Sequence, residues 1–359
     1  MRILCLTNMY PGPDAPDYGA FVRDMCNALE DRGHEVKRAA IDSRARGPLR
    51  TPGKYARLGR RAAANARWSE VIYAHYLFPT GAIAAATGRV ARRPWVLTAH
   101  GGDVANLDRT SIRTATAAGL AGASAVIAVS EYLAERLAAS GLTLPPLYVA
   151  NMGVNMAAFT VRNRTAARTR LGLAAGGPLI LAVGGLTDRK DPLTLLLAFS
   201  RLRETHPDAR LAFVGDGPLR NSIVQGIERL GLDGSVILTG AIAHEAVGDW
   251  MAASHLLALV SRVEPLGVVV LESLASGRPV VATREGGARE VLPADCGALI
   301  PPGNPLAIAD ALREVLARTP SPQTCRAAAA RNSLDSQAAI VESVLAGAVA
   351  GAPAAGRRA

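Results

Sequence analysis

The stretch SRVEPLGVVVLESLASGRPVVA, residues 261–282, is mostly apolar and yet carries two carboxylates, Glu264 and Glu272. Burial of an unpaired carboxylate is strongly unfavourable, so each acid needs a partner. We expect a helix over 267–276, whose N-terminus offers backbone N–H groups and a dipole that attract phosphate. A diphosphate on the amides of residues 266–268 would lie between the two acids.

Each carboxylate accepts hydrogen bonds from hydroxyl groups. With a diphosphate between them, Glu264 and Glu272 would reach hydroxyl-rich groups on opposite sides of the phosphates. A sugar on one side and a ribose on the other describe a nucleotide-sugar. This segment therefore suggests a ligand class before any other motif is considered.

Short apolar runs alternate with amphipathic stretches along the rest of the chain. The runs expected to form strands are 2–8, 35–41, 71–76, 94–100, 125–130 and 147–151, followed by 179–185, 210–216, 236–240, 255–260, 279–283 and 297–301. Nearly continuous apolar strands joined by helices are typical of parallel sheets covered on both faces. Because the alternation restarts after a basic linker of low order near 160–176, the sequence predicts two doubly wound α/β domains. Ligands should lie at the carboxyl ends of the strands, in the cleft between the domains.

The chain length of 359 residues also favours two domains over one. We expect a first Rossmann-like domain over 1–160 and a second over 161–335. A further helix over 336–350 is expected to pack back on the first domain, and 351–359 to form a disordered tail.

Composition excludes several classes of protein. A hydrophobic content of 49% with 19% charged residues indicates a globular chain with real cores. No apolar run is long enough to span a membrane, and the N-terminus reads as a buried strand without the cleavage region of a signal peptide. Four scattered cysteines show no metal-binding or C-x-x-C spacing and are interpreted as core residues of a reduced, cytoplasmic protein.

Positive charge is concentrated in the first half of the chain. Residues 1–165 hold 21 Lys and Arg against 12 Asp and Glu, whereas the remainder holds 19 against 18. The stretch 43–68 contains no acid and eight basic residues: Arg44, Arg46, Arg50, Lys54, Arg57, Arg60, Arg61 and Arg67. We expect this stretch to attract an anionic membrane surface or a charged acceptor, or only to keep the chain in solution.

Other candidate functional residues follow predicted strands. His100 begins HGGD (100–103), and VGGLTDRKD (183–191) offers Arg189 and Lys190 to an anion. Asp103 is interpreted as a brace of its own loop. The remaining histidines (His34, His75, His206, His244 and His255) are interpreted as structural or exposed.

The order and spacing of these motifs resemble the retaining GT-B glycosyltransferases of family 4 over nearly the whole chain. The similarity includes S-R-x-E and L-E in 261–282, and TNMYPGPDAPDYGAFV (7–22), which resembles a glycine loop. The other matching motifs are YAHYLFPTG (73–81), TAHGGD (98–103), VANMGVN (149–155), LAVGGLTDRKD (181–191), FVGDGPL (213–219) and LTGAIAHE (238–245).

The resemblance implies two Rossmann-like domains that face each other across a cleft, the first for the acceptor and the second for the donor. It also implies transfer of a sugar, with retention, from a UDP- or GDP-linked donor to a hydroxyl acceptor that is a glycan, a lipid-linked molecule or a small molecule. By the resemblance Glu264 contacts the donor sugar, Glu272 the ribose, and His100 the sugar near the reaction centre. His100 and Glu264 then act by positioning and electrostatics.

The implied donor-binding residues are Gly19, Arg189, Lys190, Gly240, Glu264, Pro265, Leu266, Gly267, Val268 and Glu272. Tyr18, Asn151 and Asn155 are assigned to the acceptor or to the hinge between domains. One position departs from the family pattern, because Gly185 stands where the family has an arginine. Arg189 beside Lys190 is expected to supply the missing positive charge.

No D-x-D sequence occurs, so we expect neither a metal nor another cofactor, and the leaving diphosphate would be stabilised by fixed charges. A GT-B-type sugar-nucleotide epimerase stays open as an alternative. A nucleic-acid-binding protein is disfavoured, because 43–68 has only Tyr55 and Trp68 for stacking. A dinucleotide oxidoreductase would need G-x-G-x-x-G after the first strand. The expected location is the cytoplasm, with peripheral contact at the inner face of the membrane.

Overall fold

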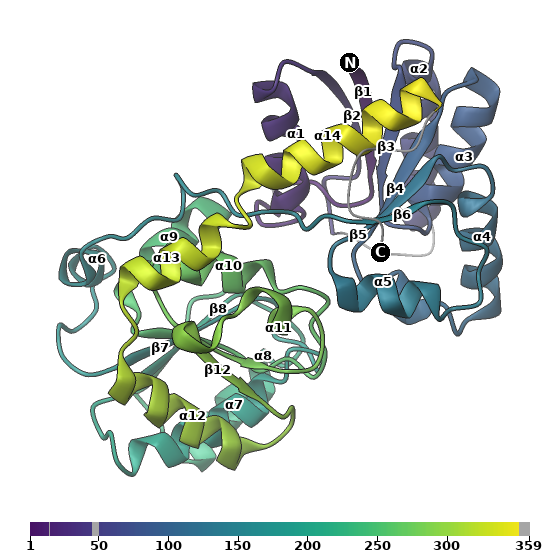
Figure 1. The fold of residues 1–359 in the computed structure, drawn as a ribbon. Coiled ribbons are helices and arrows are strands. Elements are labelled where there is room, and N and C mark those ends of the chain that lie inside the picture. The colour runs from purple at the N-terminus through teal and green to yellow at the C-terminus, as the bar shows by residue number, and fades with distance from the viewer. Residues whose placement is uncertain (14, 45–49, 352–359) are drawn as a thin grey trace. The chain divides into compact units, whose positions relative to one another are not determined.

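The computed structural model describes residues 1–13, 15–44 and 50–351, and the chain separates into two compact units (Figure 1). The first unit comprises Met1–Gly153 and the C-terminal segment from Leu334, and the second comprises Val154–Ser333. Residues 154–160, which the sequence assigned to the first domain, thus belong to the second unit. There the backbone N–H of Val154 donates to the carbonyl of Asn332 at 3.0 Å. Arg46 and the expected tail from residue 352 lie outside the described residues.

The first unit is built on a parallel sheet in the order β2-β1-β3-β4-β5-β6. Its strands are β1 (Arg2–Thr7), β2 (Glu35–Ala40), β3 (Val71–His75), β4 (Trp95–Ala99), β5 (Ala125–Ala128) and β6 (Leu147–Val149). Every residue of β3, β4 and β5 is buried, as expected of strands covered on both faces.

The helices of the first unit are α1 (Ala20–Asp31), α2 (Arg50–Ala66), α3 (Thr80–Ala91), α4 (Thr110–Leu120), α5 (Glu131–Ala138), α14 (Leu334–Ala350) and the 3₁₀ turn η1 (Val104–Asn106). α2, α3 and α4 form a row, and α14 packs beside α1 and against β3, β4 and β5 (Figure 1). β2 and β3 lie on opposite sides of β1 in the sheet. Because parallel crossovers are right-handed, α1 covers one face of the sheet and the row from α2 to α4 covers the other. The C-terminal helix therefore completes the layer that α1 begins.

The second unit contains a second parallel sheet, in the order β12-β11-β10-β7-β8-β9. Its strands are β7 (Leu179–Val183), β8 (Arg210–Val214), β9 (Val236–Leu238), β10 (Leu256–Leu259), β11 (Val280–Thr283) and β12 (Gly297–Ile300). The helices are α6 (Arg164–Arg170), α7 (Pro192–Arg203), α8 (Arg220–Arg229), α9 (His244–Ala253), α10 (Val268–Ala275), α11 (Ala288–Val291), α12 (Pro305–Arg318), α13 (Pro322–Ala330) and the 3₁₀ turn η2 (Ala294–Cys296).

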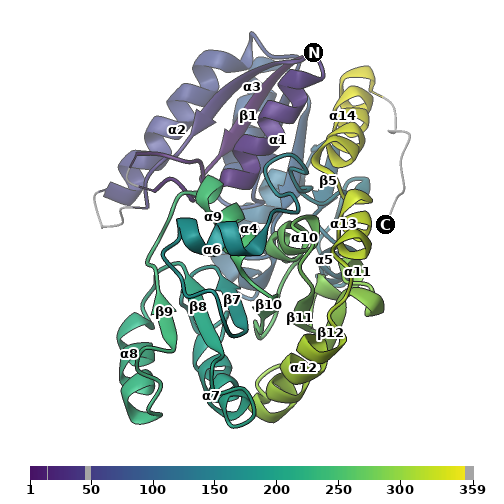
Figure 2. The ribbon, with the colours of Figure 1, turned by 90° about the vertical axis from the view of Figure 1, so that its left-hand side faces the viewer.

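Helices cover both faces of the second sheet. α7 packs against α8 and α12, and α10 packs against α9 and α13 (Figure 2). Phe199 and Leu202 of α7 and Leu312 of α12 are fully buried in the same core as the strand residues Leu211 and Leu256. The expectation of two doubly wound parallel sheets is thereby confirmed.

One segment differs from the sequence-based expectation. The linker near 160–176 was expected to have little order, but it contains α6. The Asn163 side chain accepts a hydrogen bond from the backbone N–H of Ala166 and so caps this helix. An N-cap residue before an Ala- and Arg-rich run is a helix signal in the sequence. The high polarity of the run instead favoured the interpretation as a linker.

Candidate active site

The carboxyl ends of β7 and β10 form a switch point in the second sheet. From β7 the chain proceeds to β8 on one side, and from β10 it proceeds to β11 on the other. Connections that leave neighbouring strands in opposite directions open a crevice in which ligands of α/β proteins bind. The loop after β7 carries Arg189 and Lys190, and the loop after β10 carries Glu264.

Glu264 is the centre of a buried polar cluster in this crevice and is only 7% exposed. Its Oε2 atom accepts hydrogen bonds from Lys190 Nζ at 2.6 Å and from the Ser261 hydroxyl at 2.9 Å. Arg189 Nη1 lies 3.5 Å from the same oxygen. Within the described residues no donor contacts the other oxygen, Oε1. The carboxylate is therefore held in place through Oε2, and Oε1 can still accept a hydrogen bond.

The charges around Glu264 decide its protonation state. Burial raises the pKa of a carboxyl, but the positive charges of Lys190 and Arg189 and the hydrogen bonds from Lys190 and Ser261 outweigh it. The net effect lowers the pKa of Glu264 below its ordinary value. Glu264 is consequently ionised at neutral pH.

Two glycines shape the backbone around this carboxylate. A Cβ on Gly286 would lie 1.9 Å from the carbonyl oxygen of Glu264, which also accepts the N–H of Gly287 at 2.9 Å. Gly267 has φ 81° at the start of α10, and a Cβ there would lie 2.9 Å from Leu259 Cδ2. Both positions require glycine, because a larger residue would displace the Glu264 loop.

Residues 265–268, which the sequence assigned to donor binding, form the N-terminus of α10. The first N–H groups of a helix have no partner within the helix. Pro265 contributes no N–H, whereas Leu266, Gly267 and Val268 each have a backbone donor. Leu266 is buried, and its side chain anchors this turn in the core.

Glu272 lies on α10 and is 6% exposed. Its Oε1 atom is 2.8 Å from Nε2 of His244, the first residue of α9, and the His244 ring lies 5.4 Å from that of Phe159. As with Glu264, no donor among the described residues contacts the second oxygen, Oε2. Sequence reasoning missed His244, although its place four residues after the Gly240 turn was a usable signal.

Gly240 follows β9 and has φ 73°. Its carbonyl accepts the N–H of Gly215 at 3.0 Å, which joins the turns that follow β8 and β9. A Cβ on Gly240 would meet nothing within 4 Å, so the turn borders open space. The glycine is required by the backbone angle and not by crowding.

Gly185, the departure from the family pattern, has ordinary backbone geometry. A Cβ there would contact Asp216 and Thr187 at no less than 3.7 Å, so a side chain is sterically tolerated. Arg189, the expected replacement, has a half-exposed side chain beside the carbonyl of Val263. Its guanidinium is therefore near Glu264 and within reach of solvent.

His100 follows β4 in the first unit, and Asp103 holds its loop. The Asp103 carboxylate accepts the N–H groups of His100, Gly101 and Val104 at 2.8–3.1 Å, and that of Leu77 at 2.9 Å. Asp103 therefore braces the loop, as the sequence suggested. Burial lowers the pKa of His100 to about 3, so its imidazole is neutral at pH 7.

His75, at the end of β3, is a further residue that sequence reasoning did not assign to the site. It is fully buried, and its Nδ1 atom lies 3.1 Å from Nε2 of His100. Its own Nε2 has no partner within the described residues. The rings of Phe21 and Tyr76 lie 5.1 Å and 4.7 Å from that of His100. His100 is thus held on several sides.

Tyr18 and Gly19 belong to the loop after β1. Gly19 has φ 74°, and a Cβ there would lie 2.4 Å from the carbonyl oxygen of Met9. The Tyr18 hydroxyl donates to the carbonyl of Asn8 at 3.1 Å, and Arg44 lies over its ring. The loop glycine therefore allows the chain to approach itself closely.

Asn151 and Asn155 flank the junction of the two units. The Asn151 side chain accepts the N–H of Gly153 at 2.8 Å, and the Asn155 side chain accepts those of Ala157 and Ala158 at 3.0 Å. Each asparagine stabilises its own turn.

Within residues 1–13, 15–44 and 50–351, no group of three His, Cys, Asp or Glu side chains is arranged to hold a metal ion. In the same residues, no helix has both the length and the apolar character needed to cross a membrane. All four cysteines are free and buried, in agreement with their interpretation as core residues.

Known proteins match both units. The family described as Glycosyltransferase Family 4 matches residues 19–158, and Glycosyl transferases group 1 matches residues 163–332. A putative teichuronic acid biosynthesis glycosyltransferase of Bacillus subtilis is 31% identical over 250 residues, 68% of this chain and 61% of that protein. A D-inositol 3-phosphate glycosyltransferase of Xylanimonas cellulosilytica is 34% identical over 229 residues, 60% of this chain and 54% of that protein. The chain thus spans about half to three fifths of these relatives.

Solved structures agree in fold along almost the whole chain. HepE from Anabaena in complex with UDP and glucose has a TM-score of 0.79 at 22% identity, and covers 96% of this chain and 99% of that one. Sucrose-phosphate synthase from Thermosynechococcus elongatus has a TM-score of 0.82 at 22% identity, with 98% and 100% covered. Because one glycosyltransferase family model matches each unit, the chain belongs to the family 4, or group 1, glycosyltransferases and has their GT-B fold.

Proposed function

We propose that this protein is a retaining, metal-independent glycosyltransferase that moves a sugar from a nucleotide-sugar to a hydroxyl acceptor. The observation that carries the proposal is the state of the two glutamates. Lys190 holds Glu264 through one carboxylate oxygen, and the imidazole of His244 holds Glu272 in the same way. No described donor contacts the other oxygen of either glutamate, so it can accept a hydrogen bond from a ligand. The start of α10 lies between them in sequence. This pattern fits a ligand with hydroxyl groups on both sides of a diphosphate.

In this proposal the second unit binds the donor. Oε1 of Glu264 accepts from hydroxyls of the transferred sugar, and Oε2 of Glu272 accepts from the ribose. The amides of residues 266–268 bind the diphosphate, and Arg189 and Lys190 offset the charge that develops on it as the glycosidic bond breaks. The turn at Gly240 faces the base. Among the two donors that the sequence suggested, UDP is favoured because HepE, a fold relative, binds UDP and UDP-glucose.

The first unit supplies the acceptor side. Neutral His100 positions the sugar as a hydrogen-bonding group, and Gly19 lets the loop after β1 approach the diphosphate. Tyr18, Asn151 and Asn155 are assigned to the acceptor or to the junction of the units. The acceptor presents a hydroxyl. We place the reaction in the cytoplasm, with peripheral membrane contact through the basic segment.

The test is nucleoside diphosphate release from UDP- and GDP-linked sugars in the presence of EDTA, with and without a panel of hydroxyl acceptors. We expect UDP release that depends on an acceptor and survives EDTA. An absolute requirement for Mg²⁺ or Mn²⁺ would contradict the metal-independent proposal. Conversion of the donor to another nucleotide-sugar without any acceptor would favour the epimerase.

Two variants test the assigned roles separately. Glu264→Gln should lower turnover steeply while UDP still binds, because it changes a contact to the transferred sugar. Glu272→Gln should mainly weaken UDP binding, by about 1.5–3 kcal/mol for a charged hydrogen bond. UDP affinity is measured by calorimetry in both variants. Small and equal effects of the two substitutions would return both acids to a structural role.

A further inference from the structure

A pocket of about 360 Å³ opens at the carboxyl end of β2, and neither glutamate lines it. Its apolar floor is formed by Ile41 and Leu58, and three cations of α2 line it: Lys54, Arg57 and Arg61. No residue of this pocket has been given a role in the site described above.

The three cations lie on one face of α2, because they are spaced three and four residues apart. Lys54 Nζ donates to the carbonyl of Ser43 at 2.7 Å, and Arg61 donates to that of Ala40 at 3.2 Å. These bonds hold the two side chains against the pocket wall. The exposed Arg57 side chain has no polar partner among the residues that the structure describes. Its guanidinium fork is available to a ligand.

The charge of the pocket selects the ligand. Among the described lining residues, three cations face a single carboxylate, Asp42, so these residues carry a net charge of about +2. An arginine fork binds phosphate through two parallel hydrogen bonds, and a lysine adds a point charge. A phosphate monoester carries close to two negative charges at neutral pH. Its charge therefore matches the pocket.

The position of the pocket relates it to the loop after β1. The N–H of Tyr10 donates to the carbonyl of Ile41 at 3.0 Å, and a Cβ on Gly12 would lie 2.1 Å from the carbonyl oxygen of Asp42. The pocket thus adjoins the loop that carries Tyr18 and Gly19. Any ligand anchored in it would lie beside residues assigned to the acceptor.

We propose that this pocket binds a phosphate monoester and that the acceptor of the proposed transfer carries this phosphate. The second half of the proposal rests on the proposed function, whereas the phosphate site itself does not. A general attraction of the basic segment to anions would involve all its arginines alike. The pocket involves Arg57 and Arg61 but not Arg60, which lies on the same helix outside the lining.

The test is calorimetric titration of the full chain with inorganic phosphate and glucose 6-phosphate, and with glucose and malate as controls. We expect both phosphates to bind, glucose not to bind, and malate to bind more weakly. Arg57→Gln should weaken phosphate binding about tenfold, the loss typical of a charged hydrogen bond. Arg60→Gln, which removes the same charge, should leave it unchanged.

The variant Lys190→Ala tests whether the phosphate binds at the proposed donor site and not in the pocket. We expect this variant to retain phosphate binding, because Lys190 is not part of the pocket. Equal losses in Arg57→Gln and Arg60→Gln would overturn the pocket, as would tighter binding of malate than of phosphate. UDP titrations separate the two proposals: UDP binding without phosphate binding contradicts the pocket alone, and phosphate binding without UDP binding contradicts the proposed function alone.

Discussion

Glu264 illustrates how an apolar segment can keep a buried acid ionised. Its neighbours in sequence offer only Ser261, while Lys190 and Arg189 come from a loop that follows a different strand. The sequence could predict that Glu264 needs a partner. It could not identify Lys190 as the closest one, because that contact depends on β7 and β10 being neighbours in the sheet.

The lowered pKa of Glu264 makes a testable contribution to stability. The ordinary pKa of a glutamate is about 4.3, and that of folded Glu264 lies lower. The ionised group therefore stabilises the folded state above that pH, and this contribution is lost as the pH falls through the folded pKa. We expect Glu264→Gln to reduce the free energy of unfolding at pH 7 and to have a smaller effect near pH 3. Urea unfolding at both pH values measures it, with Glu314→Gln, at an exposed position of α12, as control. A difference that is constant with pH would contradict the prediction.

The pair His75–His100 sets a tautomer. If His100 donated from Nε2, neutral His75 would carry its proton on its own Nε2, a buried atom without a partner among the described residues. A buried donor without an acceptor is more costly than an unused lone pair. We therefore expect His75 Nδ1–H to donate to His100 Nε2, which leaves the proton of His100 on Nδ1. His75 is then a positioning residue for His100.

Substitution of His75 tests this assignment. His75→Leu should lower turnover about tenfold without changing UDP affinity, since one hydrogen bond to a functional group is lost. His75→Asn, which can still donate from near the Nδ1 position, should retain most of the turnover. Nitrogen-15 NMR should report the Nδ1–H tautomer of His100 in the native protein and a mixture in His75→Leu. An unchanged tautomer together with normal turnover in His75→Leu would exclude the positioning role.

Among the elements, α9 shows how one helix is fixed at both ends. Its first residue, His244, contacts Glu272. At its other end, arginines donate to four successive carbonyls: Arg278 to Met251 and Ala252, Arg168 to Ala253, and Arg164 to Ser254. The carbonyl of Met251 also accepts from the N–H and the hydroxyl of Ser254. The last carbonyls of a helix otherwise lack helical partners, and positive charge at a helix C-terminus is favourable. The arginines thus hold the helix that positions His244.

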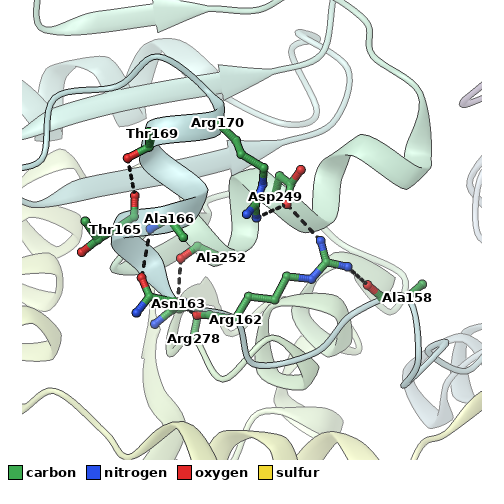
Figure 3. A network of polar contacts seen from close by, with 10 residues as sticks. All are labelled: Ala158, Arg162, Asn163, Thr165, Ala166, Thr169, Arg170, Asp249, Ala252 and Arg278. Carbon is green, nitrogen blue, oxygen red and sulfur yellow. Dashed lines mark hydrogen bonds and ion pairs between the residues drawn. The ribbon is translucent and has the colours of Figure 1, made fainter.

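Two further arginines, from the segment 162–170, contact the middle of α9 (Figure 3). Arg162 and Arg170 both donate to the Asp249 carboxylate, at 3.0 Å and 2.8 Å. Arg278 approaches the same region and also donates to the carbonyl of Arg162. Burial and repulsion from Arg164 lower the pKa of Arg278 to about 10, so it stays charged at pH 7.

Removal of the Arg278 side chain should destabilise the second unit. Arg278→Met leaves the carbonyls of Met251 and Ala252 without these donors in a buried setting, and relief of repulsion between arginines offsets part of the loss. We expect a decrease of about 2–4 kcal/mol in the free energy of unfolding. Arg313→Met, in a surface pair with Asp310, should change it by less than about 1 kcal/mol. Similar values for both variants in urea unfolding would show that the carbonyl contacts contribute little.

Most elements of the fold could be predicted, because buried parallel strands leave a simple apolar pattern. All twelve expected strands form, including the short β9 (Val236–Leu238). The exception, α6, is a polar helix held by tertiary contacts such as those of Arg168. The site was predictable only in part: Glu264 and Glu272 stood out as acids among apolar residues, whereas His75 and His244 became recognisable through partners distant in sequence.

At the scale of the whole molecule, the excess positive charge belongs to the first half of the chain and gathers on α2, which carries five basic residues, while the adjacent α3 adds Arg89. The two helices enclose an apolar groove of about 780 Å³, lined by Ala63, Ala64 and the 81% exposed Val90, with Arg67 in its wall. Neither helix contains an acid. The other apolar residues of the groove are alanines and the partly buried Ile83, so the groove lacks the Trp, Phe and Leu side chains of helices that insert into bilayers. This face therefore suits adsorption to an anionic surface.

We expect the protein to co-sediment with vesicles that contain phosphatidylglycerol and not with pure phosphatidylcholine vesicles. Binding should disappear in 1 M salt, where the screening length falls to about 3 Å. The double substitution Arg60→Glu and Arg67→Glu should abolish it, whereas Arg57→Gln in the phosphate pocket should reduce it only slightly. Binding to neutral vesicles, or binding that survives high salt, would indicate insertion and contradict the electrostatic account. If the protein binds neither kind of vesicle, the membrane role is excluded and the positive charge of α2 serves the phosphate pocket only.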